Sequence, residues 1–181
     1  MKATGIVRRM DDLGRVVIPK EIRRTMRIRE GDPLEIFTQQ DGEVVFKKYS
    51  PLGELTPLAV PLTDVMAKTC GTTVAVTDRD RVVAVAGPGR KDLADRKISG
   101  ELDTLLESRQ TYTAPGEDKL RPADGVERFA AVAVPILSAG DVLGAVCVFS
   151  PEDDLRGSAA PRESELRLAQ VGAGFLGKQM E

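Results

Sequence analysis

Arginine and lysine side chains are concentrated at the start of the chain, where they could bind phosphate groups or base edges. The first thirty residues contain nine Lys/Arg and four Asp/Glu, a net charge of +5. The basic residues are Lys2, Arg8, Arg9, Arg15, Lys20, Arg23, Arg24, Arg27 and Arg29. A guanidinium group can hold a phosphate through two hydrogen bonds, or contact the O6 and N7 atoms of guanine. Because single-strand binding relies on aromatic stacking and no aromatic residue precedes position 30, we expect duplex DNA as the ligand.

The rest of the chain has a different character. Residues 51–181 contain fifteen Lys/Arg and twenty Asp/Glu, so a basic segment is joined to an acidic remainder. The complete lack of histidine removes the usual general base and the commonest zinc ligand, so we expect neither an enzyme nor a metal or cofactor site. Cys70 and Cys147 lie in apolar stretches without CxxC spacing, which favours buried free thiols over a redox pair. No apolar run is long enough for a membrane span and the start is not a secretory signal, so a cytoplasmic, nucleoid-associated protein is expected.

Short elements must position the basic residues. Residues 4–10 and 15–19 are predicted strands around a turn at 11–14, and Pro19 ends the second. Residues 20–26 are predicted to form a two-turn helix, with Ile22 and Met26 on its apolar side and the basic residues on the other. Residues 34–38 and 43–49 form a predicted hairpin around Asp41-Gly42. A unit of about fifty residues buries too little surface to fold alone, so we expect at least an obligate dimer.

The run Asp11-Asp-Leu-Gly-Arg-Val-Val-Ile-Pro-Lys-Glu-Ile-Arg23 closely resembles the signature of AbrB-type DNA-binding domains. The resemblance covers residues 1–50 and implies a swapped-hairpin β-barrel built by two chains. The family's DNA-contacting arginines correspond to Arg8, Arg15, Arg23 and Arg24. Arg9, Lys2 and Lys20 are weaker candidates, since Arg9 would point to the opposite side of the strand from Arg8. The alternative is that Arg23 and Arg24 form a solvated helix face paired with Glu21 or Glu30.

Beyond a predicted linker at residues 51–58, a second domain spans residues 59–181. Helical segments are expected from residue 61, over 91–109 and over 162–180, with a long loop at 112–127. Hairpins are expected at 72–86 and 129–149. This order resembles a GAF domain, most of all in the run Val132–Phe149, and predicts an α+β chain whose second domain is a small α/β sandwich with an antiparallel sheet.

An AbrB-type domain followed by a GAF-like domain resembles a family of transcription regulators of endospore-forming bacteria. The resemblance implies a homotetramer, paired through the barrels at one end and through helices of the second domain at the other. On the last helix Leu168, Val171 and Phe175 either pack between chains or belong to the domain's own core, and the pattern leaves both open. The loop Gly87-Pro-Gly-Arg-Lys91 could cradle an anion, although a plain turn is favoured; a small-molecule effector remains unidentified.

Three functions are compatible with these features. The first is a sequence-specific activator or repressor of sporulation genes. The second is an antitoxin-like protein whose barrel mainly binds another protein; it is disfavoured because antitoxins with this barrel have a disordered acidic tail, whereas residues 59–181 have a folded pattern. The third is a ligand-processing enzyme tethered to DNA, which the absence of histidine and of a nucleophile motif disfavours.

Overall fold

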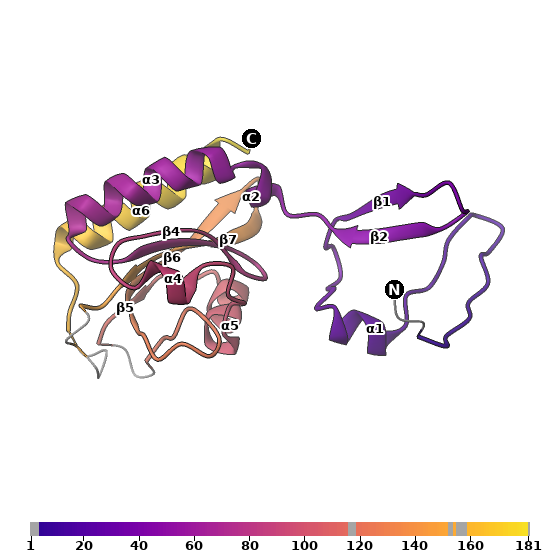
Figure 1. Ribbon diagram of the computed structural model, residues 1–181, viewed down its shortest axis with the longest axis horizontal. Helices are drawn as coiled ribbons and strands as arrows, with labels where there is room; N and C mark the ends of the chain where they lie inside the picture. Colours follow the sequence, from indigo (N-terminus) through magenta and orange to yellow (C-terminus); the bar gives the residue numbers. More distant parts are fainter. Residues whose placement is uncertain (1–3, 116–118, 152–153, 155–158, 181) are drawn as a thin grey trace. The chain divides into compact units, whose positions relative to one another are not determined.

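The computed structural model describes residues 4–115, 119–151, 154 and 159–180. The chain divides into two units, Met1–Tyr49 and Ser50–Glu181 (Figure 1). They are called the first unit or first domain and the second unit or second domain. Each has its own secondary structure, and each is described by itself below.

The first unit contains one helix and one hairpin. Helix α1 spans Lys20–Thr25, and strands β1 (Leu34–Thr38) and β2 (Val44–Lys48) pair antiparallel with Leu34 opposite Lys48 and Thr38 opposite Val44. Gly42 has a φ of +82°, which a glycine adopts without strain and which the turn between the strands requires. The predicted helix and hairpin are therefore confirmed, each within two residues of its expected bounds.

The two predicted strands at 4–10 and 15–19 are wrong for the single chain. Both segments lack a ladder in the part of the first unit that the structure describes, although the turn between them is closed by a hydrogen bond from Asp11 N to Arg15 O of 3.0 Å. A β-strand is defined by hydrogen bonds to a neighbouring strand. Apolar, β-branched sequence therefore indicates a segment suited to a sheet, but supplies no neighbour within the same chain.

The first unit has almost no interior of its own. Among residues 4–49 Pro19 alone is fully buried. The large apolar side chains left exposed in this unit are those of Ile6, Val7, Met10, Leu13, Val16, Val17, Met26, Ile36, Phe37, Val44 and Phe46. The first unit therefore buries little of its apolar surface within a single chain.

The second unit is a five-stranded antiparallel sheet with helices on both faces. Its strands, in the order β4-β3-β7-β6-β5, are β3 (Val74–Asp78), β4 (Val82–Ala86), β5 (Tyr112–Thr113), β6 (Ala130–Ser138) and β7 (Asp141–Phe149). The helices are α2 (Pro51–Glu54), α3 (Thr56–Cys70), α4 (Arg90–Leu93), α5 (Gly100–Ser108) and α6 (Glu163–Lys178). The predicted α+β class, with two hairpins and helices before, between and after them, is confirmed.

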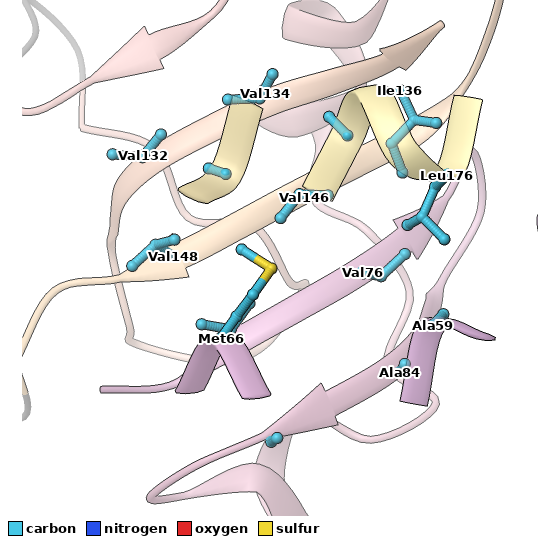
Figure 2. Close-up of a cluster of buried hydrophobic side chains, with 14 of the residues drawn as sticks. Ala59, Met66, Val76, Ala84, Val132, Val134, Ile136, Val146, Val148 and Leu176 are labelled. Carbon is cyan, nitrogen blue, oxygen red and sulfur yellow. The ribbon is translucent and has the colours of Figure 1, made fainter. Parts of the chain in front are cut away.

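Two apolar layers hold this unit together. On one face of the sheet α3 and α6 lie side by side and bury Met66 and Leu176 against β3, β6 and β7 (Figures 1 and 2). On the other face α4, α5 and the segment before β6 cover Cys147 and Phe149. Strands enclosed on both faces are apolar on both sides, which explains the continuous burial of β3 and of most of β6 and β7.

The predicted linker at residues 51–58 is wrong, because this segment is helical. Ser50 is the N-cap of α2, its hydroxyl accepting a hydrogen bond from Gly53 N at 3.3 Å, and the side chain of Leu52 is completely buried in the core. Proline is favoured in the first turn of a helix, where the missing N–H has no intrahelical partner. The prolines at 51 and 57 therefore mark helix starts rather than an extended connection.

Three smaller predictions in the second unit differ in detail. Helix α3 begins at Thr56, with Pro61 inside it, rather than at residue 61. The single helix predicted over 91–109 is wrong: α4 and α5 are separate, and Ser99 caps α5 by accepting a hydrogen bond from Leu102 N at 3.0 Å. The predicted loop at 112–127 begins with the short strand β5, and its residues 116–118 lie outside the described part.

Both cysteines are free and buried, as predicted. Burial raises the pKa of the Cys147 thiol to about 12. The pKa of Cys70 is also raised, mainly by burial and further by the nearby carboxylate of Glu165. Neither thiol is therefore readily ionised near neutral pH.

Candidate nucleic-acid interface

A tight turn at residues 11–14 positions Arg15, one of the predicted contact arginines. The side chain of Asp11 closes the turn, because its Oδ1 atom accepts hydrogen bonds from the backbone N–H groups of Leu13 (3.0 Å) and Arg15 (2.8 Å). Gly14 follows with a φ of +76° and donates its N–H to Asp11 O at 3.1 Å. Arg15 is thus the first residue after a well-defined turn.

The side chain of Arg15 is held by the same carboxylate. Its Nε donates to Asp11 Oδ2 at 2.7 Å, while 71% of the side-chain surface stays exposed. The backbone N–H of Arg15, followed by its guanidinium, lowers the pKa of Asp11 below its ordinary value, so this carboxylate is ionised at neutral pH. The result is an exposed cation beside a fixed anion.

Helix α1 carries Arg23 and Arg24 on its last turn. The buried Pro19 precedes the helix and its carbonyl oxygen accepts a hydrogen bond from Arg23 N at 2.9 Å, while Ile22 is half-buried. Both arginine side chains are exposed, and cations at a helix C-terminus interact favourably with the helix dipole. Within the residues that the structure describes, neither arginine forms an ion pair with Glu21 or Glu30.

The remaining predicted contacts are more scattered. Arg8 is exposed, and its guanidinium donates to the carbonyl of Val7 at 3.1 Å. Arg9 and Lys20 are also exposed, while Lys2 lies outside the described residues. In the described part of the chain the side chain of Arg15 is bonded to Asp11, and Arg23 and Arg24 share one helical turn, but no hydrogen bond or ion pair joins the turn to the helix.

In the predicted loop Gly87–Lys91 of the second unit, residues 87–89 form a turn and Arg90 and Lys91 begin α4. A Cβ at Gly87 would lie 2.7 Å from the backbone oxygen of Thr72, and Gly89 has a φ of +68°, so both glycines answer to local backbone geometry. Arg128 donates to Pro88 O at 2.8 Å and its guanidinium stacks over Phe149 at 5.2 Å. These contacts support the plain-turn interpretation.

The last helix presents two apolar faces. Its inner face consists mainly of small residues together with Leu176, whose side chain is completely buried. Of the three residues predicted for oligomerisation, Leu168 packs partly against the core, whereas Val171 and Phe175 remain 68% and 42% exposed. The choice that the sequence pattern left open is therefore decided against a core role for Val171 and Phe175.

Sequence analysis missed the part of this surface that α3 contributes. Leu58, Leu62 and Val65 follow one another at helical spacing, with Val65 62% exposed. Helix α3 lies beside α6, since a Cβ at Gly172 would be 3.7 Å from Leu62 (Figure 1). We call Leu58, Leu62, Val65, Leu168, Val171 and Phe175 the α3–α6 face. The signal was present as an i, i+4, i+7 apolar repeat on α3.

The described residues contain no helix long and apolar enough to cross a membrane. They also contain no group of three or more His, Cys, Asp or Glu side chains placed to hold a metal ion.

Both parts of the chain match known protein families. Residues 54–181 match the family described as "Stage V sporulation protein T C-terminal, transcription factor", and residues 7–53 match that of the MazE antitoxins, "Antidote-toxin recognition MazE, bacterial antitoxin". Stage V sporulation protein T of Bacillus subtilis (strain 168) is 45% identical over 183 residues, which cover 100% of this chain and 99% of the relative. This chain belongs to the stage V sporulation protein T family. It is therefore a member of a family of transcription factors, not of enzymes.

The two domains of this family member also resemble solved structures. The "N-terminal DNA Recognition Domain of the Bacillus subtilis Transcription-State Regulator AbrB" is 59% identical and covers 28% of this chain and 94% of its own, with a TM-score of 0.25. The predicted AbrB-type resemblance of the first domain is confirmed by the transition state regulatory protein AbrB of Bacillus subtilis (strain 168), which is 59% identical over 51 residues, 28% of this chain and 52% of that protein. Type II free methionine-R-sulfoxide reductase of Thermoplasma acidophilum covers 71% of this chain and 94% of its own, at 10% identity and a TM-score of 0.52. At that identity the likeness concerns the fold of the second domain alone.

Proposed function

We propose that this chain regulates sporulation genes as an activator or repressor that binds duplex DNA sequence-specifically through Arg8, Arg15, Arg23 and Arg24. The observation that carries the proposal is that the arginines after the turn and on α1 are exposed and have unused hydrogen-bond donors. Arg23 and Arg24 are exposed without an ion pair among the described residues, and Arg15 is exposed with only its Nε engaged. Guanidinium groups in this state are available for phosphate oxygens and for guanine edges.

The proposal includes a dimer formed by the first domain. Its apolar side chains are exposed along residues 6–17, in segments that have no strand partner within one chain. A second copy supplies both the missing strand neighbours and the missing core, as the swapped-hairpin barrel implied by the AbrB-type resemblance would. Such a dimer doubles the number of arginines that DNA can contact.

The proposal also includes a tetramer formed through the α3–α6 face. An exposed apolar surface on two adjacent helices is typical of helix packing between subunits. It is supported by the exposure of Val65, Val171 and Phe175. Two dimers joined in this way would bind two DNA segments with an avidity that a single dimer lacks. Modulation of this assembly by a small molecule stays a prediction.

A salt titration of DNA binding tests the DNA-binding part of the proposal. The intact protein is compared with a variant in which the four arginines are changed to alanine, on a duplex that the wild-type protein has selected from a randomised pool. Affinity should fall by about 0.9 log units per log unit of salt for each phosphate neutralised. Each base-contacting arginine lost should weaken binding by about 1–3 kcal/mol, and the melting temperature should not change.

A matched control removes the same charge from the second domain. The control variant changes four exposed basic residues there to alanine: Lys68, Arg90, Lys91 and Lys97. Binding that survives in the control and collapses in the first variant supports the proposal. Equal losses in both variants would mean that only overall charge matters, and would contradict specific recognition by the first domain.

A second candidate is binding of a partner protein by the first domain, which the match of residues 7–53 to the antitoxin family favours. The folded second unit, in place of a disordered acidic tail, argues against it. A wild-type protein that ignores duplex DNA even at low salt would make this candidate the leading one.

A further inference from the structure

The carboxylate of Asp11 serves two purposes in the turn before Arg15. One oxygen, Oδ1, accepts the backbone N–H groups of Leu13 and Arg15 and so closes the turn. The other oxygen, Oδ2, accepts Nε of Arg15 at 2.7 Å. The backbone and the side chain of the same arginine are therefore fixed by one group four residues earlier.

This contact uses only the inner nitrogen of the guanidinium. An arginine has five N–H donors in a planar fork, and the bond through Nε occupies one of them. The four donors on the two terminal nitrogens have no other partner among the described residues. Because the fork is planar and rigid, holding Nε limits the directions in which these four donors can point.

A carboxylate next to a DNA-contacting arginine is electrostatically unfavourable for DNA binding. DNA phosphates attract positive side chains and repel a fixed negative charge beside them. We propose that Asp11 is a positioning residue for DNA recognition: it holds the guanidinium of Arg15 so that its terminal nitrogens meet the DNA in an already ordered direction. The inference rests on the proposed function, and assigns to Asp11 a role that acts only through Arg15.

Asp12 provides a matched control for Asp11. It is the next residue in the same turn, carries the same charge and is exposed, and it has no hydrogen bond or ion pair in the described part of the chain. Asp11→Asn and Asp12→Asn each raise the net charge by one. Asn at position 11 keeps a carbonyl oxygen to accept the two backbone N–H groups, but turns an N–H donor towards Nε of Arg15.

The two variants separate charge from position. If the negative charge at position 11 only repels DNA, Asp11→Asn binds more tightly, as Asp12→Asn should. If Asp11 orders Arg15, Asp11→Asn weakens binding by roughly two- to ten-fold, the factor corresponding to ordering one long side chain at an interface. Asp11→Asn should then also lower the ratio of the affinity for the selected duplex to the affinity for sonicated mixed-sequence duplex. The reason is that base recognition needs more exact geometry than phosphate binding.

The closing experiment is a double-mutant cycle by fluorescence anisotropy, with wild type, Asp11→Asn, Arg15→Ala and the double variant on both duplexes, and Asp12→Asn alongside. We expect Asp11→Asn to weaken binding to the selected duplex when Arg15 is present and to have no effect on binding when Arg15 has been replaced by alanine. It is overturned if Asp11→Asn binds as well as Asp12→Asn, or if it weakens binding equally without Arg15, which would make its role that of the turn alone.

The same measurements distinguish the failure of the inference from that of the proposed function. If Arg15→Ala binds the selected duplex like wild type, the assignment of Arg15 to DNA recognition fails, and the role of Asp11 fails with it. If Arg15→Ala weakens binding while Asp11→Asn does not, only the positioning role fails. Thermal melting of each variant checks the fold, and an exposed ion pair of this kind contributes little to it.

Discussion

Replacing Val171 and Phe175 with serine should separate the proposed tetramer into dimers while leaving each domain folded. Both side chains lie on the outer side of α6, away from the buried Leu176. Because they are exposed in the single chain, their removal opens no cavity in the core of the second domain. Any free energy gained by burying these two side chains therefore stabilises the association that covers them, and not the fold of the domain.

The magnitude follows from the exposed fractions. Complete burial of a valine or phenylalanine side chain stabilises by about 1.5–3 kcal/mol. With 68% of Val171 and 42% of Phe175 still to be covered, the gain is on the order of 1 kcal/mol for each side chain, about 2 kcal/mol per chain and about 4 kcal/mol for a pair of chains. At about 1.4 kcal/mol for each factor of ten, the double substitution should weaken this association roughly a thousandfold.

The assay is sedimentation velocity over a dilution series, with thermal melting at one fixed concentration. Gln170→Ser on the same helix is the control for an exposed position outside the α3–α6 face and should sediment as wild type. Leu176→Ala is the control for a core position and should destabilise the domain by about 2–5 kcal/mol. The Val171/Phe175 variant should resemble neither, because it changes the assembly and not the fold.

Two results would refute this reasoning. If the variant sediments as wild type at every concentration, the α3–α6 face does not hold the chains together. If it melts at as low a temperature as Leu176→Ala, Val171 and Phe175 contribute to the domain's own core in solution. A dimer that still binds a single DNA site, but has lost affinity for a duplex carrying two, would support the tetramer further.

Two other predictions concern the second domain. Gly144→Ala should destabilise it by about 3 kcal/mol or more in urea unfolding, because a Cβ there would lie 1.8 Å from Thr77 O across the β3–β7 ladder; a wild-type midpoint would contradict the close approach of these strands. Burial raises the pKa of Cys147 from 9.0 to about 12, so between these values the folded thiol keeps a proton that the unfolded thiol has lost, and stability should decline as pH rises through this range. Cys147→Ala should remove that part of the decline, and iodoacetamide should label this thiol only after denaturation.

Elements defined by local chemistry were predicted well from the sequence. The three hairpins follow from paired β-branched runs around short turns, and the glycine of each of two turns, Gly42 and Gly140, takes a positive φ. Helix α1 follows from the stop at Pro19 and the short amphipathic run after it. In each case the determining residues lie within a few positions of one another.

Elements whose definition depends on residues far away in the sequence, or on another chain, were not predicted well. Residues 4–10 and 15–19 have the composition of strands but find no neighbour within the described part of the chain. Residues 51–58 have the proline and glycine content of a linker, yet the burial of Leu52 in the second domain makes them helical. Proline and glycine mark both helix starts and chain breaks, and only packing distinguishes the two.

What the sequence determined by itself was the character of the first domain, because the uninterrupted motif from Asp11 to Arg23 follows a known family pattern, contains Arg15 and Arg23, and is flanked by Arg8 and Arg24. The tertiary structure alone decided how the side chain of Arg15 is held and which apolar faces are buried. Asp11 contacts Arg15 only because the turn folds back on itself. On α6 the sheet accepts small residues, since a Cβ at Gly177 would lie 2.1 Å from Leu137 O, and this close packing leaves Val171 and Phe175 outside. Periodicity identifies apolar faces, but which of them is buried depends on the surface that it meets.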